Sequence, residues 1–497
     1  MKPIHVQLCA AGFAALAAVA SADTNAPASG ARSQPPPQPL YSDALLITSS
    51  AVPPTEAQCE TVGRRCFTPQ AVQSAYNVAP LYAQGLNGAG QTIAIVDSYG
   101  SDTIAHDLHV YDQAFGLQPM CGEEGVTCAP GMPTFTRLAL QGAPATKAPP
   151  GTSNGTGQEN KAGWDIEVSL DVETAHAMAP MANIILVTTP TAETLGVQGF
   201  PQMMAAEDYV VKNHLAQVIS QSFGAAEESF NGTASLLNLR YAFTDAAQNG
   251  VTVLAASGDN GTANPAKAPV SKGGTLIPFP TVGWPASDPL VTGIGGTYLC
   301  TDPTATSSAP RTLYLGPPAK CLAFPTQEEV GWTFSGGGFS HVFSTPAYQS
   351  ALPAGSTAIG TMRGVPDVGF QASAGTGALV YVSLPPDGSS GLLCGGVPCS
   401  TGWYDIGGTS LSTPQWAGLI AIAAQLNGGG LGPINAALYK IGSGPRYSSD
   451  FYDITTGNNT ADPSVAGYPA TTGWDPITGL GTPNAANLIP DLVAAAH

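Results

Sequence analysis

One segment of the chain reads Gly407-Gly408-Thr409-Ser410-Leu411-Ser412-Thr413-Pro414-Gln415-Trp416-Ala417-Gly418. The two glycines allow a tight turn of the backbone. Pro414, expected in a first helical turn, precedes an apolar run that is typical of a helix. Ser410 is therefore expected at or just before a helix N-terminus, where backbone N–H groups and the helix dipole favour negative charge. A serine nucleophile needs this setting because its attack creates an oxyanion, although an ordinary N-cap serine would produce the same local pattern.

The overall composition narrows the class of protein. The 497 residues include 34 acidic and 16 basic side chains, and the net charge is -18. Nucleic acid is not an expected partner, because phosphate contacts need clusters of Lys and Arg and the sequence has none. Hydrophobic residues make up 43% of the chain, beside 59 Gly and 44 Pro, which indicates a loop-rich globular protein. The small number of basic residues also limits charge repulsion in an acidic medium.

The first 22 residues are typical of a secretory signal peptide. Lys2 provides the positive start, Leu8 to Ala20 form a short apolar run, and Ala20-Ser21-Ala22 is an A-x-A cleavage site. The run is too short to span a bilayer, and no later run reaches about 18 apolar residues. We therefore expect a secreted or periplasmic protein with no membrane segment after the signal is cleaved.

Removal of the signal peptide also removes Cys9 and leaves an even number of cysteines. The eight are Cys59, Cys66, Cys121, Cys128, Cys300, Cys321, Cys394 and Cys399. An even count in an exported chain indicates disulfides, and eight cysteines allow 105 connectivities. We predict the four local pairs 59/66, 121/128, 300/321 and 394/399. A zinc site is disfavoured because no CxxC or Cys/His spacing fits one.

Beyond the signal, residues 23–65 are rich in Ala, Pro and Ser, which predicts a flexible leader. A single large catalytic domain is expected over 66–497. The predicted strands are 92–97, 182–188, 217–220 and 251–255, and the predicted helices are 71–81, a stretch ending near 115, 167–177, 199–213 and 235–248. This alternation predicts an α/β fold with a parallel sheet, helices on both faces, and sites where strands end and helices begin.

A serine nucleophile needs a base, and the histidines offer no clear candidate. His106 and His109 lie three apart on a predicted helix, and His176 lies in an apolar helical stretch, so surface and packing roles are favoured. The pair Glu167 and Asp171 is the better candidate. At i and i+4 of a helix their Cβ atoms lie about 5–6 Å apart, so the two would share a proton and one pKa would rise. Apolar neighbours argue against the alternative, an open acidic surface.

A third acidic residue, Asp259, follows the predicted strand 251–255 in the run Ser257-Gly258-Asp259-Asn260-Gly261. At the carboxyl edge of the sheet it would lie near Ser410 and, when protonated, could donate a hydrogen bond to an oxyanion. A plain turn role is the alternative, because Asn260-Gly261 is a typical turn dipeptide.

Together these motifs resemble the sedolisin family of serine-carboxyl peptidases. Ser410 matches its Gly-Thr-Ser-x-x-x-Pro nucleophile motif, Glu167 and Asp171 match its Glu-x-x-Leu-Asp helix, and Asp259 matches the oxyanion Asp of its Ser-Gly-Asp motif. Residues 335–340 and 363–367 also match. The resemblance covers about residues 67 to 490. It implies a subtilisin-like, doubly wound, mostly parallel sheet and a monomeric serine-type peptidase that acts on proteins or peptides.

The resemblance also implies one structural calcium ion near the C-terminus. Asp453 and Asp475 would supply carboxylates, and Ile454, Thr471 and Gly473 would supply backbone carbonyls. Water would complete the 6–8 oxygens that calcium prefers. The family often has Gly where Thr471 stands, a change that a backbone ligand tolerates. Two turn aspartates are the alternative interpretation.

The chain departs from the family in two respects. The family is usually made with a large prodomain, whereas only about 43 residues lie between the predicted signal and the start of the resemblance. Phe223 stands where many members carry Trp, and a phenylalanine cannot donate a hydrogen bond. Asp97, at the end of the first predicted strand, either extends the carboxyl chain from Asp171 or is a strand-end turn residue.

Three functions are compatible with these motifs. The leading hypothesis is a secreted acid endopeptidase, the second is an exopeptidase that removes tripeptides from N-termini, and the third is an inactive homologue that binds peptides. The presence of all four matching residues argues against the third. The first two differ in whether loops close the cleft, which the sequence does not reveal.

Overall fold

The computed structural model describes residues 38–39, 41–140, 156–190, 199–266, 275–306, 311–384, 393–394 and 397–497. The predicted signal peptide and the leader up to residue 37 lie outside these ranges. Among the helices that are described, none is long and apolar enough to cross a membrane.

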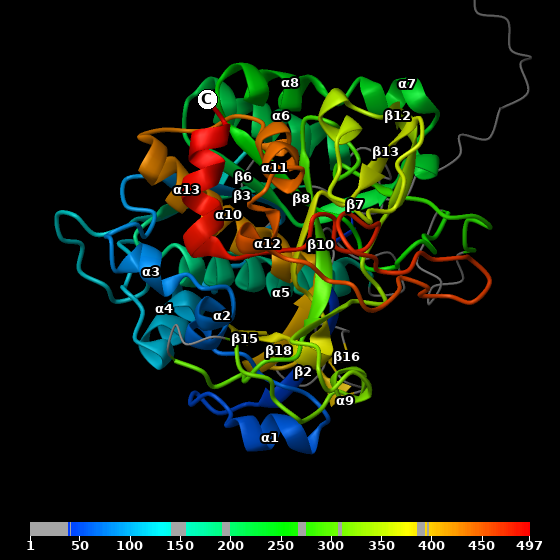
Figure 1. Cartoon of the computed structure of the whole chain (residues 1–497). Helices are drawn as coiled ribbons and strands as arrows, with labels where there is room; N and C mark the ends of the chain where they lie inside the picture. Colours follow the sequence, from blue (N-terminus) through cyan, green and yellow to red (C-terminus); the bar gives the residue numbers. More distant parts are fainter. Residues whose placement is uncertain are drawn as a thin grey trace, which may run out of the picture. The chain divides into compact units, whose positions relative to one another are not determined.

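An eight-stranded sheet forms the framework, in the order β11-β10-β8-β6-β3-β5-β4 with β14 also paired to β10 (Figure 1). The strands are β3 (Thr92–Ser98), β4 (Phe135–Ala139), β5 (Asn183–Thr189), β6 (Val218–Gln221), β8 (Thr252–Ala256), β10 (Thr292–Leu299), β11 (Glu329–Gly331) and β14 (Val368–Gln371). All pairs are parallel except β10 with β11. The short strands β6, β8 and β14 are wholly buried, as expected for a parallel sheet covered on both faces.

Helices cover both faces of this sheet, and the side chains of β3 alternate between the two faces. Ile93 and Ile95 pack into the cluster that contains the apolar residues of α10 (Thr409–Asn427) and α13 (Ala485–Ala495). Ala94 and Val96 point the other way, into the cluster built with α6 (Gly199–Lys212) and α8 (Tyr241–Gln248). Successive strand residues face opposite sides of a sheet, so each face gains its own core. The predicted doubly wound, subtilisin-like α/β fold is confirmed.

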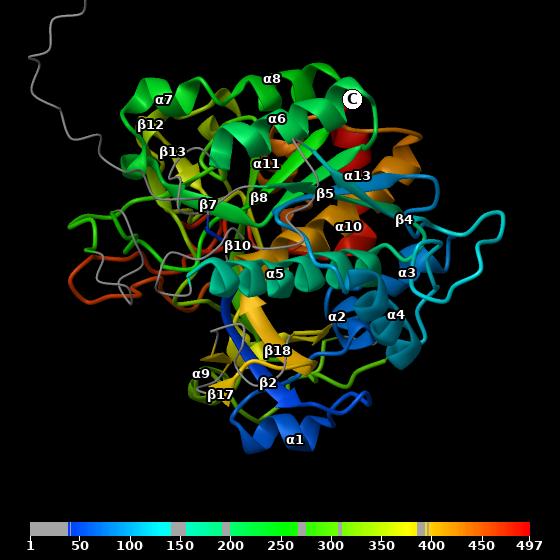
Figure 2. The ribbon, with the colours of Figure 1, turned by 180° about the vertical axis from the view of Figure 1, so that it is seen from behind.

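Helix α5 (Thr156–Met178) lies between the main sheet and a second, smaller sheet (Figure 2). That sheet is antiparallel, with β18 (Gly402–Gly408) between β15 (Ala378–Val382) and β2 (Tyr41–Thr48). Apolar residues of α5 enter three different clusters: Val168 and Val172 one, Ile166 and Leu170 another, and Trp164 a third. A helix with apolar contacts on every side is buried all round.

The remaining elements connect these layers. They are β1 (Gln38–Pro39), α1 (Glu56–Thr61), α4 (Ile104–Phe115), β7 (Phe223–Ala226), β9 (Gly283–Trp284), α9 (Ala319–Ala323), β12 (Gly338–Ser344), β13 (Met362–Val365), β16 (Leu393–Cys394), β17 (Val397–Pro398), α11 (Asn435–Gly442), α12 (Tyr447–Asp450), β19 (Phe451–Tyr452) and β20 (Thr482–Pro483).

Several predicted elements have different bounds in the structure. The helix expected over 71–81 is two short helices, α2 (Pro69–Ala75) and α3 (Ala79–Tyr82), because Asn77 between them has a φ of 55°, outside the helical region. The helix expected over 235–248 is likewise divided into α7 (Thr233–Leu237) and α8. Conversely, α5 begins at Thr156, well before the expected 167.

Two further expectations were wrong in detail. Pro414 lies inside α10 rather than in its first turn, so the carbonyl of Ser410, four residues earlier, has no helical N–H donor. Part of the stretch expected to be a flexible leader is ordered, since it contains β2 and α1. Strand β2 is ordered because β18 supplies backbone partners and Ala44 enters a buried cluster.

All four predicted disulfides are confirmed: Cys59–Cys66, Cys121–Cys128, Cys300–Cys321 and Cys394–Cys399. Each disulfide joins two cysteines that are close in the sequence, as we predicted.

Two arginines are fully buried and act as internal donors. Arg363 forms an ion pair with Asp367, Nη2 to Oδ2 at 2.8 Å, and donates to four backbone carbonyls as well. Arg65 donates to the carbonyls of Thr301, Tyr314, Gly316 and Pro317. Both side chains connect segments that are distant in sequence, because the N–H groups of a buried guanidinium need hydrogen-bond acceptors.

Candidate active site

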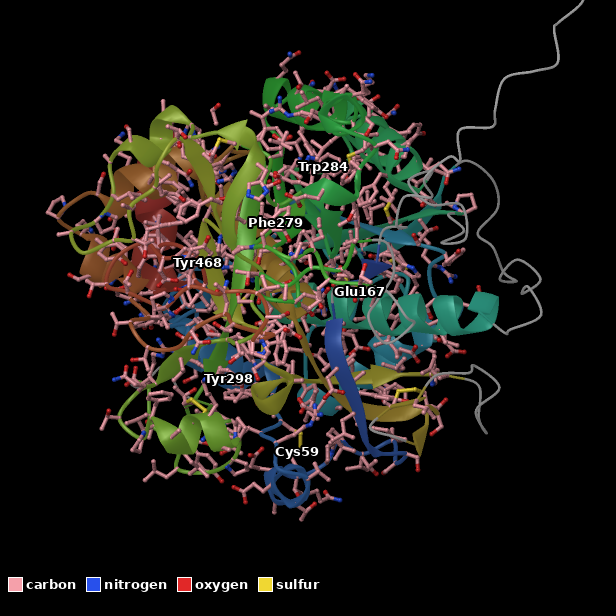
Figure 3. The ribbon with its side chains drawn as sticks, turned by 90° about the vertical axis from the view of Figure 1, so that its right-hand side faces the viewer. Cys59, Glu167, Phe279, Trp284, Tyr298 and Tyr468 are labelled. Atoms are coloured by element: carbon pink, nitrogen blue, oxygen red, sulfur yellow. A yellow bond between two sulfur atoms is a disulfide. The ribbon has the colours of Figure 1, made fainter. Side chains whose placement is uncertain are left out.

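The carboxyl ends of three parallel strands bring acidic and hydroxyl side chains to one edge of the main sheet. Asp97 is the penultimate residue of β3, Ser222 directly follows β6, and Asp259 follows β8 after Ser257-Gly258. Helix α5 crosses nearby with Glu167 near its middle, as Figure 3 shows. Because parallel strands end at the same edge, residues that are far apart in sequence meet there.

Ser410 reaches this edge from the second sheet. It is the second residue of α10, which follows β18 without a loop. The junction needs its glycines: a Cβ at Gly407 would lie 2.1 Å from the backbone nitrogen of Ala374, and Gly408 has a φ of 137°. Ser410 is thereby held at a helix N-terminus, as predicted from the sequence. Its hydroxyl donates to the carbonyl of Ser222 at 3.4 Å.

Asp259 is fixed to the residue before Ser410. Its Oδ1 accepts from the backbone N–H of Thr409 at 2.8 Å and from the Thr409 hydroxyl at 2.9 Å. Its Oδ2 is buried and has no hydrogen-bond partner in the described part of the chain. Burial raises the pKa of Asp259 to about 7, against the lowering effect of the two Thr409 donors. The carboxyl therefore holds a proton at acid pH and has one oxygen free to donate it.

Glu167 and Asp171 form a buried acidic pair one helical turn apart. Both side chains are fully buried. Burial and the charges of Asp171 and Asp97 raise the pKa of Glu167 well above its usual value, while the nearby Ser410 hydroxyl lowers it. Burial and the charge of Asp97 likewise raise the pKa of Asp171. Close carboxyls in a low dielectric cannot all ionise, so the group retains protons.

Asp97 belongs to this acidic group and is not a turn residue. It lies within β3, fully buried, and neither of its carboxylate oxygens has a hydrogen-bond partner among the described residues. Burial raises the pKa of Asp97 to about 8. Of the two readings that the sequence left open, the structure places Asp97 beside Asp171 and Glu167.

Two functional neighbours were not identified from the sequence. The hydroxyl of Ser222 donates to Oδ1 of Asp171 at 2.9 Å, and the same residue accepts from Ser410 through its carbonyl. Thr409 joins Asp259 to the nucleophile segment and also accepts from Gly258 N–H at 3.0 Å. Ser222 follows the end of a strand and Thr409 begins a helix, as Asp97, Asp259 and Ser410 also lie at strand ends or a helix start. That shared position is the sequence signal that could have identified them.

The three histidines that the sequence analysis considered lie elsewhere, as expected. His106 and His109 contact Glu124 and Glu123 on the outer side of α4, and His176 is buried against Asp112 at 3.1 Å. Phe223, the departure from the family pattern, is fully buried and packs edge-on against Phe200, with ring centroids 6.0 Å apart.

A cavity of about 440 Å³ opens beside Asp259. Its walls carry three aromatic side chains, Tyr298, Trp332 and Phe334, together with Asn260, Ser373, Ala374, Gly375 and Asp43. Tyr298 is labelled in Figure 3. Apolar walls with a few polar groups are typical of a ligand site, and the place of Asp259 in the wall connects this cavity to the acidic group.

The predicted calcium residues lie in one C-terminal region and fit an oxygen-only site. Both carboxylate oxygens of Asp453 accept from Gly473 N–H, and Asp475 accepts from the N–H groups of Thr471, Ile477 and Thr478. The carbonyls of Ile454, Thr471 and Gly473 accept no hydrogen bond in the described part of the chain. Two carboxylates and three uncommitted carbonyls are the ligand types that calcium prefers. No cluster of three or more His, Cys, Asp or Glu side chains among the described residues could hold a metal.

Comparison with known proteins identifies the family. No protein-family model matches the chain. Kumamolisin from Bacillus sp. (strain MN-32) is 31% identical over 450 residues, which cover 89% of this chain and 66% of kumamolisin. Sedolisin from Pseudomonas sp. (strain 101) is 31% identical over 345 residues, covering 68% of this chain and 51% of that protein. Human tripeptidyl-peptidase 1 is 29% identical over 357 residues, covering 68% and 53%.

A solved structure agrees with these relatives. Pseudomonas sedolisin, a serine-carboxyl proteinase solved with two molecules of pseudo-iodotyrostatin, matches with a TM-score of 0.60 and 25% identity, over 86% of this chain and 98% of that one. The chain belongs to the sedolisin family, whose members include serine-type peptidases that bind calcium. It spans about half to two thirds of the length of the relatives described above.

The burial of Asp97 generates a prediction about stability and pH. An Asp titrates near 3.9 in an unfolded chain, whereas Asp97 keeps its proton to about pH 8 in the fold. The folded state thus binds more protons than the unfolded state between these values, and the free energy of unfolding should fall as pH rises from 4 to 8. The substitution Asp97→Asn removes the titrating group. The free energy of unfolding should then decrease less steeply with pH, by up to about 1.4 kcal/mol per pH unit.

Urea unfolding of the wild type and Asp97→Asn at several pH values between 4 and 8 measures the two slopes. Ser49→Ala, at an exposed position and without a titrating group, is the control and should leave the slope unchanged. Equal slopes in the wild type and Asp97→Asn would contradict a proton held at Asp97.

Proposed function

We propose that the chain is an acid-active serine-carboxyl endopeptidase, with Ser410 as nucleophile, Glu167 and Asp171 as the base system, and Asp259 as an oxyanion donor. The observation that carries this proposal is that Ser410 of α10, the acidic pair of α5 and Asp259 after β8 meet at one edge of the sheet. Ser410, Glu167 and Asp171 are fully buried there. A peptide-binding protein without catalysis has no need of a buried acidic pair beside a helix-terminal serine.

The proton of the Ser410 hydroxyl goes to Glu167 as Oγ attacks the substrate carbonyl carbon. Glu167 can be the ionised member of the group, because the Ser410 hydroxyl is the contact that lowers its pKa. Asp171 and Asp97 hold the remaining protons, which leaves Glu167 free to accept one. The Ser222 hydroxyl orients Asp171 through a hydrogen bond of 2.9 Å. A base whose pKa is raised into the working range is efficient at accepting and returning a proton.

The negative charge that develops on the substrate oxygen is stabilised by two donors. One is a backbone N–H at the start of α10, where the helix dipole adds to the effect. The other is the Oδ2–H of protonated Asp259, which has no protein partner in the described part of the chain. Thr409 donates two short hydrogen bonds to Oδ1 of Asp259. These bonds fix the orientation of the carboxyl group and so the direction of Oδ2.

Endopeptidase action is supported by the course of this chain's own backbone. Residues 38–39 pair with β7 next to Ser222, and residues 41–48 pair with β18 next to Ser410. We expect a substrate chain to pair with β7 and β18 in the same way and to extend on both sides of Ser410, as internal cleavage requires. The second candidate, removal of N-terminal tripeptides, is favoured only by the presence of tripeptidyl-peptidases among the relatives. We further propose that the mature protein is an exported monomer with one bound calcium ion.

The first prediction tests the nucleophile. Ser410→Ala should lower the cleavage of denatured protein substrates at acid pH by more than about 10⁴-fold, because the group that forms the new bond is lost. Mass spectrometry of the products from the wild type should show internal cuts rather than successive tripeptides.

Ser412→Ala is the matched control, two residues further along the same helix. Its hydroxyl donates to the carbonyl of Gln371 at 2.9 Å, so its loss should affect stability but leave turnover within a few-fold. Near-native turnover by a folded Ser410→Ala would refute the assignment.

The second prediction concerns acid dependence. Asp259 should lose its proton as pH rises through about 7, so activity should decline toward neutrality from a maximum below pH 6. Asp259→Ala should lower kcat by about 10²–10³-fold through loss of one oxyanion donor. Asp259→Asn keeps a donor that does not titrate, so its loss should be smaller and its basic limb flatter. A wild-type optimum at pH 7 to 9 would contradict this mechanism.

The third prediction concerns calcium, which the free carbonyls and two carboxylates of the C-terminal region would hold. Chelation should lower the melting temperature of the wild type, because an ion bound only to the folded state adds RT ln(1 + [L]/Kd) to stability. Asp475→Ala should lower it as well and remove the response to added calcium. Elemental analysis before and after chelation must show that calcium was present and then removed. An unchanged melting temperature after removal would exclude a stabilising ion.

A further inference from the structure

The proposed oxyanion donor, Asp259, lies in a loop rather than on a strand or helix. It follows the end of β8 after two further residues. Thr409 fixes one oxygen of its carboxyl group, but these bonds do not fix the backbone that carries the side chain. A donor must lie about 2.7–3.1 Å from the developing oxyanion, and loops hold a catalytic group less precisely than regular elements do. The loop over residues 257–261 therefore needs support of its own.

Residues 334–337 support this loop from one side. The N–H of Gly261 donates to the carbonyl of Phe334 at 2.8 Å, and the N–H of Gly336 donates to the carbonyl of Gly258 at 2.7 Å. A Cβ at Gly336 would lie 2.2 Å from the carbonyl oxygen of Ser257, so the two backbones are in direct contact. Backbone hydrogen bonds thus lie on both sides of Asp259 along the loop, and its position follows that of residues 334–337.

The buried side chain of Asn459 fixes residues 334–337 in turn. Asn459 has no exposed surface. Its amide nitrogen lies within hydrogen-bond distance of three carbonyl oxygens, those of Ser335 at 3.2 Å, Gly337 at 3.4 Å and Pro476 at 3.1 Å. Its amide oxygen accepts from the N–H of Tyr468 at 2.8 Å. An amide group has two N–H donors and one carbonyl acceptor, so both ends of this side chain are engaged and its orientation is fixed.

The segment that carries Asn459 also contacts the Asp259 loop directly. Residues 455–470 are here called the C-terminal loop. The hydroxyl of Thr262 donates to the carbonyl of Ala466 in this loop at 3.0 Å. A Cβ at Gly261 would lie 2.3 Å from the carbonyl oxygen of Asn459. In Figures 1 and 2 the C-terminal loop, drawn in orange-red, runs beside the green segment that follows β8.

We propose that Asn459 is a positioning residue for Asp259: through residues 334–337 and the C-terminal loop, it holds the backbone of Asp259 so that the free carboxyl oxygen meets the developing oxyanion. This inference rests on the proposed function, in which Asp259 is an oxyanion donor. Asn459 itself does not touch the substrate, because its amide group is committed to the chain's own backbone.

A residue that acts in this way has a distinct kinetic signature. The oxyanion forms only in the transition state, so a displaced donor lowers kcat without weakening the binding of the substrate. Asn459→Ala should therefore lower kcat by about 10- to 100-fold, as expected for a displacement of about 1 Å at the reacting centre. KM for a peptide substrate should stay within about twofold of the wild-type value.

A double-mutant cycle with Asp259→Ala tests whether the effect passes through Asp259. The kcat of the wild type, both single variants and the double variant is measured at the acidic pH of maximal activity. Once Asp259 is absent, Asn459 has no donor to position, so adding Asn459→Ala should lower kcat by less than about threefold. An equal loss in both backgrounds would overturn the inference, because Asn459 would then act independently of Asp259.

The single variant Asp259→Ala tests the proposed function separately. An unchanged kcat in this variant would refute the oxyanion role, and the positioning role with it. A reduced kcat in Asp259→Ala, together with a wild-type kcat in Asn459→Ala, would overturn only the positioning role.

Asn435→Ala is the matched control for the loss of a buried amide. The Nδ2 of Asn435 donates to the carbonyl of Val291 at 2.8 Å and to the hydroxyl of Tyr348 at 3.2 Å, and its Oδ1 accepts from the Thr292 hydroxyl at 2.7 Å. Urea unfolding should show lower stability for both asparagine variants. Only Asn459→Ala should lose kcat. An equal loss of kcat in Asn435→Ala would overturn the inference, since kcat would then follow stability alone.

Hydrogen exchange gives a readout that does not depend on activity. In Asn459→Ala the amides of residues 257–263 should exchange at least about tenfold faster than in the wild type, because their support is loosened. Asn435→Ala should leave their exchange unchanged. Wild-type protection of residues 257–263 in Asn459→Ala would overturn the inference, whatever the enzyme's activity.

A milder variant serves if Asn459→Ala does not fold. Thr262→Val keeps the shape of the side chain and removes the hydrogen bond to Ala466. It should lower kcat by about two- to fivefold and have no effect in the Asp259→Ala background. A wild-type kcat and wild-type exchange of residues 257–263 in Thr262→Val would contradict a positioning role for the C-terminal loop.

Discussion

The burial of α5 on every side from Ile166 to Met178 is the constraint on which the rest of the site depends. The helix is enclosed by the main sheet on one side and by β15, β18 and β2 on the other. Carboxyls on such a helix cannot ionise as they would in water, because burial disfavours the charged form. The pKa values of Glu167, Asp171 and Asp97 are therefore raised, and the three carboxyls do not all ionise together. The acid mechanism proposed above follows from where the helix is buried, and in it the hydroxyls of Ser410 and Ser222 would select the carboxyl group that ionises.

The same burial connects the two sheets. Strand β18 packs against α5 on its way to α10, so the position of Ser410 is fixed relative to Glu167 by apolar contacts rather than by a direct, well-aligned hydrogen bond between them. Asp259 reaches the same point from β8 through Thr409. Three separate chain segments thus meet at Ser410, the proposed nucleophile. No loop separates β18 from α10 at this point. That rigid junction is the kind of support that precise positioning of a catalytic group requires.

Much of this arrangement was predictable from local pattern. The strands at 92–98 and 252–256 and the helix at 104–115 follow from apolar runs and periodicity, and the i, i+4 carboxyl pair needed only the helix itself. Local sequence pattern did not predict the structure where contacts with distant parts of the chain determine it. Strand β2 forms because β18, over 350 residues away, completes its pairing. Asp97 looked equally like a turn residue because the carboxyls beside it come from another element. Asn77 interrupts a helix through a positive φ that its sequence context did not reveal.

The buried arginines have a consequence for the fate of the protein among other hydrolases. The chain has only 16 Lys and Arg residues, and Arg65 and Arg363 are sealed inside it. An enzyme of the trypsin type must draw a basic side chain and several flanking residues into its own cleft, which needs an exposed and locally extended segment. Neither Arg65 nor Arg363 meets this requirement while the chain is folded. Hydrolysis at these two positions therefore requires the chain to open first, so cleavage there would report on unfolding rather than on the surface of the native state.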